Sequence, residues 1–285
     1  MGEGALIAVR AALMLDLALL LGLPLFWWVM GRAGRAAMIA WLAVGGLLLS
    51  AFWLIASTAA MTGTTVLAPD WASVAVLLTM TPIGPVLAVR ACALLLSLLL
   101  ALAGRVRLAI VPAALAAATL AWTGHAGATE GLGGTLHRAA DVAHIWAAAA
   151  WIGALAALLH AALRLRSGHD PRPVATMLAR FALMGTLVVA TLVVSGAVNL
   201  VMIAGLAELL ALLGSRYGWL LAAKLGLFAL MLGLAAANRW RLTRALERGG
   251  DGALVHLRRS LLVETSAAVA IIGLVAWLGT LDPMA

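Results

Sequence analysis

The sequence predicts an all-α, polytopic integral membrane protein with eight transmembrane helices, two parallel four-helix repeats and both termini outside. The first observation behind this prediction is composition, since hydrophobic residues make up 65% of the 285-residue chain and charged residues only 11%. The second is that apolar runs of about twenty residues, the length that crosses a bilayer as a helix, recur from end to end. The third is an internal repeat, which relates one apolar run in each half of the chain.

Eight apolar runs are long enough to cross the membrane as helices. They cover roughly residues 5–30, 36–58, 84–104, 108–124, 136–162, 179–203, 218–238 and 259–280. The segment from Asp70 to Met80 is too short for a span, and Pro82 and Pro85 follow it closely. We expect an interfacial or re-entrant helix there.

The basic residues indicate how the helices are oriented. The net charge is +8, and most of the arginines stand in every second connection between apolar runs. Because cytoplasmic loops are enriched in Lys and Arg, these connections are predicted to be cytoplasmic, and both termini to lie outside. The charge is therefore a topology signal and no sign of a nucleic-acid partner. The connections carry Arg32, Arg35, Arg105, Arg107, Arg164, Arg166, Arg172, Arg239, Arg241, Arg244, Arg248, Arg258 and Arg259.

The internal repeat relates the third apolar run to the seventh. The segment GPVLAVRACALLLSLLLALAGRVRL, which starts at Gly84, aligns without gaps to GWLLAAKLGLFALMLGLAAANRWRL, which starts at Gly218. The alignment places Arg90 on Lys224, so a cation inside the apolar run coincides in the two copies. We therefore divide the single transmembrane domain 1–285 into halves 1–124 and 125–285, related by an axis along the membrane normal.

Ionisable residues inside these runs need an explanation, because each costs about 3 kcal/mol near the bilayer centre. One interpretation is structural pairing, of Arg90 or Lys224 with Asp16 or Asp141; the other is a functional polar layer. Counted from the helix ends, most of these residues lie in the outer half of the membrane, and Glu264 lies nearer the cytoplasm, where it could pair with the basic loop. The charge-balancing set is Asp16, Arg90, Lys224 and Glu264.

The fifth apolar run begins with a polar stripe, HRAADVAHIW. His137, Asp141 and His144 stand at i, i+4 and i+7, within about 60° of one another on a helix. The two histidines are about 10 Å apart along the helix axis, so they cannot both bind one metal ion. A metal site would combine Asp141 with one of them and with a further ligand, for which His125 is the nearest candidate. The open alternative is a structural hydrogen-bond cluster.

Other features of the chain narrow the function classes. Cys92 is the single cysteine, which excludes an internal disulfide and a CxxC metal site. No nucleophile with a matched base and no Gly-rich phosphate loop is present, so we expect neither an enzyme nor an ATP-driven pump. Methionines near the outer side are soft ligands for Cu(I), but they form no cluster and serve only as corroboration. These methionines are Met61, Met80, Met202 and Met284, with Met14 deeper.

From Gly124 to Leu281 the sequence resembles the copper resistance protein D (CopD/PcoD) family. The similar pieces are GH at 124, HRAADVAHIWAAAAWIGAL, RFALMGTLVVATLVVSGAVN, YGWLLAAKLGLF, NR at 238 and LRRSLLVE. The resemblance implies a bacterial inner-membrane protein that handles periplasmic copper with a periplasmic copper-binding partner. It brings to attention His125, His137, His144, Arg90, Lys224 and Glu264.

Two functional hypotheses follow. The first is copper import or delivery from the periplasm through the outer polar layer, with copper bound by His125, His137, Asp141 or His144. The alternative is a haem-binding redox or porphyrin-processing membrane enzyme, because histidines on adjacent helices also serve as axial haem ligands. Against haem, His125 at a helix end and His144 would differ in depth by about 13 Å. A Soret band in the purified protein would favour the haem hypothesis.

Overall fold

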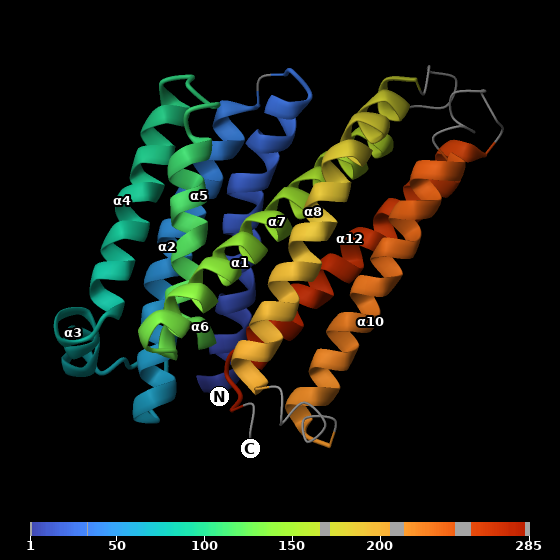
Figure 1. Ribbon diagram of the computed structural model, residues 1–285. Coiled ribbons are helices and arrows are strands. Elements are labelled where there is room, and N and C mark those ends of the chain that lie inside the picture. Colours follow the sequence, from blue (N-terminus) through green and yellow to red (C-terminus); the bar gives the residue numbers. More distant parts are fainter. Residues whose placement is uncertain (1, 33, 166–171, 206–213, 243–251, 283–285) are drawn as a thin grey trace.

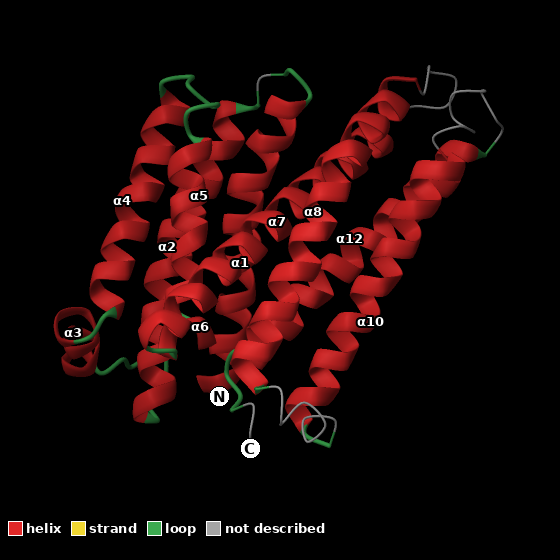
Figure 2. Ribbon diagram, viewed as in Figure 1, coloured by secondary structure: helices red, strands yellow, loops and turns green. Residues whose placement is uncertain are grey.

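The computed structural model describes residues 2–32, 34–165, 172–205, 214–242 and 252–282, and within these ranges the chain is helical apart from loops and one isolated bridge (Figure 2). Seven helices are long and apolar enough to cross a membrane: α1, α2, α4, α7, α8, α10 and α12. The all-α, polytopic membrane class is therefore confirmed. The bounds are α1 Gly2–Val29, α2 Ala36–Thr62, α3 Trp71–Met80, α4 Ile83–Leu102, α5 Ile110–Ala118, η1 Thr119–Trp122, α6 His125–Ala128, α7 Gly131–Arg164, α8 Arg172–Ala204, α10 Arg216–Ala237, η2 Asn238–Leu242 and α12 Ala253–Leu278.

The fourth predicted span differs from the others. The run expected over 108–124 forms α5 and then the 3₁₀ segment η1, which together end at Trp122 and are shorter than the long helices. The change from α to 3₁₀ comes at Thr119, whose hydroxyl donates to the Ala116 carbonyl at 2.6 Å. Because a 3₁₀ turn rises faster per residue, the short segment gains length. Eight full crossings stay a prediction.

The helices run alternately up and down in Figure 1. Helices α1, α4, α7 and α10 run one way, α2, α5, α8 and α12 run the other way, and the ends of α1 and α12 that carry the chain termini lie at the same end. The α1–α2 and α4–α5 connections lie together at the opposite end, and both carry arginines that are predicted to be cytoplasmic. The two connections touch at this end, because an ideal Cβ on Gly34 would be 3.0 Å from Val106 Cγ1. We call this the basic end and the other the outer end.

Short helix α3 lies at the outer end, beside the start of α4 (Figure 1). Asp70 caps it, because its carboxylate accepts hydrogen bonds from the backbone amides of Ala72 and Ser73 and from the Ser73 hydroxyl. These donors lower the pKa of Asp70 below its usual range. The segment is a ten-residue helix, as its shortness and its flanking prolines predicted.

Helices α1 and α7 form the centre of the bundle and cross at Gly22 and Gly153. An ideal Cβ on either glycine would overlap backbone atoms of the other helix, those of Ala149 and Gly153 for Gly22 and those of Gly22 for Gly153. Such close backbone approach between membrane helices requires residues without side chains. The crossing therefore brings together the first helices of the two sequence halves.

The remaining helices pack around this crossing in a similar way in each half. Helix α1 packs against α2 and α5, and α4 against α5; likewise α7 packs against α8 and α12, and α10 against α12. One pair differs: α2 packs against α4, whereas the described parts of α8 and α10 do not pack along their lengths, and α8 instead meets η2. The two-repeat arrangement itself stays a prediction.

Candidate functional site

Polar side chains from three helices meet in the outer half of the second half-bundle. On α7, the Asp141 Oδ1 atom accepts a hydrogen bond from Asn199 Nδ2 of α8 at 3.0 Å. One turn further in, the His144 Nδ1 atom lies 3.0 Å from Ser195 Oγ of the same helix. These residues and Lys224 of α10 form what we call the outer polar cluster. It forms because polar residues three apart on α7 face polar residues four apart on α8.

Two cations from other helices lie within electrostatic range of Asp141. Lys224 of α10 and Arg10 of α1 both interact electrostatically with this carboxylate. The Arg10 guanidinium also donates to the Gly279 carbonyl at the end of α12, at 3.1 Å. The sequence left open a pairing of Lys224 with Asp141, and this ion pair stays a prediction. Arg10 is a further cation in the surroundings of Asp141 that the pairs expected from the sequence did not include.

The hydrogen-bond network assigns the tautomer of His144. Ser195 Oγ donates its one proton to the Thr191 carbonyl at 2.5 Å, so this hydroxyl can only accept from the imidazole. The Leu192 carbonyl, on the same turn of α8, is another acceptor for the ring. His144 Nδ1 therefore carries the proton, and Nε2 keeps its lone pair. Gly196 makes room for the ring, because an ideal Cβ there would be 3.4 Å from His144 Cε1.

Of the two other histidines predicted as ligands, His137 lies apart from His144, and the side chain of His125 is not described. His137 is only 1% exposed, and its Nδ1 lies 2.9 Å from the Thr129 hydroxyl, near the start of α7. His125 begins α6, and its side chain lies outside the part of the structure that is described. Among the described residues, no three His, Cys, Asp or Glu side chains converge. The set of His125, His137, Asp141 and His144 therefore stays a predicted metal site.

The charges of the first half are arranged differently. Arg90 is completely buried on α4, donates from Nε to the Thr119 hydroxyl at 2.6 Å and stands 5.9 Å from the ring centre of Trp53. The Asp16 carboxylate instead lies against Gly46 of α2, where an ideal Cβ would be 3.0 Å from Oδ2. Gly46 and Trp53 are about 10 Å apart along α2. No ion pair joins Asp16 and Arg90 in the described structure.

Glu264 lies in the half of the bundle nearer the basic end and is 2% exposed. Its Oε1 atom accepts hydrogen bonds from Asn238 Nδ2 and from Ser260 Oγ, the latter at 3.3 Å. These partners are neutral, whereas the sequence led us to expect that Glu264 pairs with the basic loop before α12. Much of that loop, residues 243–251, lies outside the described residues. Ser195, Asn199 and Asn238 are site residues that the sequence analysis missed. The signal was available, because each is a neutral polar residue inside an apolar run.

Comparisons with known proteins concern the family of the chain. A family model described as the N-terminal domain of copper resistance protein D-like proteins matches residues 1–135, and the model described as copper resistance protein D matches residues 175–278. Copper resistance protein D of Pseudomonas syringae pv. tomato is 36% identical over a 307-residue alignment, which covers 97% of this chain and 96% of that protein. No solved structure matches the chain.

Proposed function

This chain belongs to the copper resistance protein D family, and from that premise we propose that it imports copper, or delivers it inward, across a bacterial inner membrane. Copper is the cargo and enters through the outer polar cluster. A periplasmic copper-binding protein is the partner that would supply the ion at the outer end.

The observation that carries the proposal is the state of His144. Its Nδ1–H is held by Ser195, so Nε2 presents the lone pair that a metal ion needs. A hydrogen bond from the other ring nitrogen is also the usual way in which a ligating histidine is oriented. Imidazole nitrogen suits copper in either oxidation state better than a carboxylate does.

A second observation supports a cation at this place. Asn199 Oδ1 is buried and accepts no hydrogen bond, although the amide nitrogen of the same side chain is bound to Asp141. A buried acceptor without a donor is costly, and a bound cation would satisfy it. Met202, one turn further out on α8, lies beside Gly133 at the start of α7, which puts a soft thioether at the entrance.

The test compares two histidines of α7. We expect purified His144→Ala to retain at least tenfold less copper than the parent, as measured by metal analysis, because a lost ligand weakens metal binding directly. His160→Ala is the matched control and should bind as the parent does, since His160 is exposed near the basic end. Asp141→Asn should bind copper more weakly than His160→Ala and more tightly than His144→Ala. If the carboxylate only orients the site, its copper affinity should fall by roughly 10 to 100-fold.

Equal copper retention by the parent and His144→Ala, with both proteins folded, would contradict this site. A Soret band in the purified parent would instead favour the haem-binding alternative. If that coloured protein also contained no copper, the haem-binding function would replace the copper function as the proposal.

A further inference from the structure

A second polar region lies nearer the basic end, in a cavity of about 230 Å³ between α7, α8, α10 and α12. It is located where α8 and α10 stand apart and η2 closes the gap. Its volume is many times the space that one water molecule requires. The side chains with polar atoms that line it are Trp151, Thr186, Asn238, Arg239, Trp240 and Glu264.

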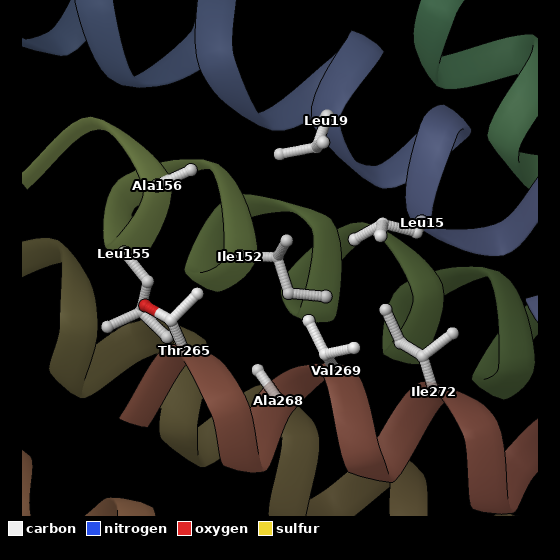
Figure 3. Close-up of a pocket in the computed structure, with 9 residues that line it drawn as sticks. All are labelled: Leu15, Leu19, Ile152, Leu155, Ala156, Thr265, Ala268, Val269 and Ile272. Atoms are coloured by element: carbon white, nitrogen blue, oxygen red, sulfur yellow. The ribbon is translucent and has the colours of Figure 1, made fainter. Parts of the chain in front are cut away.

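An apolar groove between α1, α7 and α12 shows the contrast (Figure 3). It has about 180 Å³ and is lined by aliphatic side chains, with Thr265 as the one polar residue. The Thr265 hydroxyl donates to the Leu261 carbonyl of its own helix at 2.7 Å, so nothing in this groove requires water. Apolar cavities of this kind stay dry. The cavity at Glu264 has a different chemistry.

One buried polar atom at the Glu264 cavity, the indole nitrogen of Trp151, lacks a partner among the described residues, and the Glu264 carboxyl has one oxygen without a hydrogen bond there. Glu264 receives both of its hydrogen bonds on Oε1, and its Oε2 has no hydrogen-bond partner among the described residues. The indole N–H of Trp151, a residue that is 4% exposed, has no acceptor. Trp151 can only donate, whereas a carboxyl oxygen can accept or carry a proton. The cavity is large enough for water that would accept from the indole and bond to the carboxyl, and buried polar groups without partners are costly.

Among the residues that the structure describes, the hydrogen-bond partners of Glu264 include no cation. On η2, the Arg239 guanidinium donates to the Thr186 hydroxyl at 3.1 Å. On α12, Arg258 donates to the Ala162 and Leu165 carbonyls at the end of α7, and on α8, Arg180 points to the Met30 carbonyl. On α7, the residue with a polar side-chain atom that lines the cavity is the uncharged Trp151. Helix α1 packs against α12 at the apolar groove and not at this cavity (Figure 3).

An ionised carboxylate in this place would be expensive. Glu264 is eleven residues from the start of α12, or about 17 Å into the bundle. A buried charge without a counter-ion costs several kcal/mol, so a carboxyl group there takes up a proton or acquires a cation. With the proton on Oε2, the O–H group can donate to cavity water while Oε1 accepts from Asn238 and Ser260, and every position is satisfied.

From this geometry we propose that Glu264 is a proton-binding site, which exchanges its proton with the basic end of the bundle through the hydrated cavity between α7, α8, α10 and α12. The site goes beyond copper binding at His144 and does not depend on it. The five-residue π-helix η2 supports the assignment, because it presents Asn238 to Glu264 and π-helical turns occur often at functional sites.

The first test is infrared spectroscopy of the purified protein. A protonated carboxylic acid has a carbonyl band that a carboxylate lacks, and we expect this band to lose intensity in Glu264→Gln and as the pH is raised. Asp141→Asn is the matched control and should keep the band, because the cations Lys224 and Arg10 lie within electrostatic range of Asp141 and favour its charged form. An unchanged band in Glu264→Gln would overturn the proposal.

The second test probes the route to the site with dicyclohexylcarbodiimide. The O–H of a protonated carboxyl adds across a C=N bond of the reagent, and acyl migration to nitrogen gives a stable N-acylurea without another reactant. Mass spectrometry should find the adduct on Glu264, in an amount that falls as pH rises. Gly185→Leu, which fills the cavity, should reduce labelling at least several-fold; Gly226→Leu, outside the cavity, should not. If the amount of adduct on Glu264 changed neither with pH nor in Gly185→Leu, the proposed route would be refuted.

Discussion

Thr119 shows how a single hydroxyl can stabilise a buried charge. Arg90 is fully enclosed, and its Nη1 and Nη2 atoms have no hydrogen-bond partner, so the bond from Nε to Thr119 and the ring of Trp53 are the polar contacts that it has. Hydrogen bonds to charged groups are worth more than neutral ones, and burial leaves water no access to replace them.

We therefore predict that Thr119→Val, which keeps the shape but removes the hydroxyl, destabilises the protein by roughly 1.5–3 kcal/mol. Thermal unfolding of the purified protein in detergent should show this as a lowered midpoint. Thr265→Val is the control, because its hydroxyl bonds only to its own helix and lies in the apolar groove. Equal midpoints for the two variants would show that Arg90 does not depend on Thr119.

At the scale of elements, the crossing of α1 and α7 determines where the two halves meet. Gly22 and Gly153 let the two backbones touch, and no side chain can be added to either without moving a helix. Since the outer polar cluster is built on α7 and one of its cations, Arg10, comes from α1, the same crossing also sets the distance between Arg10 and Asp141. Packing at the glycines and charge balance in the cluster are therefore linked.

Gly153→Ala should separate α1 from α7 and lower the thermal midpoint, at a cost of about 1–3 kcal/mol, which is typical of overpacking. Gly273→Ala is the control on α12, where an added Cβ would meet nothing within 4 Å. That change should be neutral or stabilising by about 0.5–1 kcal/mol, because alanine favours a helix interior over glycine. If Gly273→Ala lowered the thermal midpoint and Gly153→Ala did not, the close contact of α1 and α7 at Gly153 would be contradicted.

At the scale of the whole molecule, the basic and outer ends give the protein its direction. We predict that reporters fused after Arg35, Arg107, Arg166 or Arg248 are cytoplasmic, and that those near Gly63, Ala128 or Gly214 are outside. Arg166 and Arg248 lie outside the described residues, so at these two sites the prediction rests on sequence alone. Alkaline phosphatase and green fluorescent protein fusions would measure it, and one inverted pair of loops would refute the eight-helix topology.

The proposed repeat also belongs to this scale. Arg90 and Lys224 lie seven and eight residues after the first residues of α4 and α10, and these helices run in the same direction. Helix pairs of the first half have counterparts in the second, except that α2 packs against α4 while α8 and α10 stand apart. If the halves are duplicates, the separation of α8 from α10 created the Glu264 cavity. In the first half, the corresponding helices α2 and α4 pack directly against each other.

The sequence by itself determined the class of the protein and which of its polar residues share a helix face. Apolar runs of membrane-spanning length follow from hydrophobicity alone, and the register of a helix places Asp141 and His144 on one face at nearly one depth. The motifs in the second half were also enough to identify the family, which the matches over both halves confirm. These properties are local, so they can be read one segment at a time.

Only the tertiary structure decided which groups meet. It placed Lys224 and Arg10 within electrostatic range of Asp141, formed no ion pair between Asp16 and Arg90 in the described residues, and gave Glu264 a hydrogen bond from the amide of Asn238. Depth and face restrict the possible pairs but do not select among them, because selection depends on which helices are neighbours. That neighbourhood is set by packing at Gly22 and Gly153, where the decisive feature is the absence of a side chain on both helices at the same place.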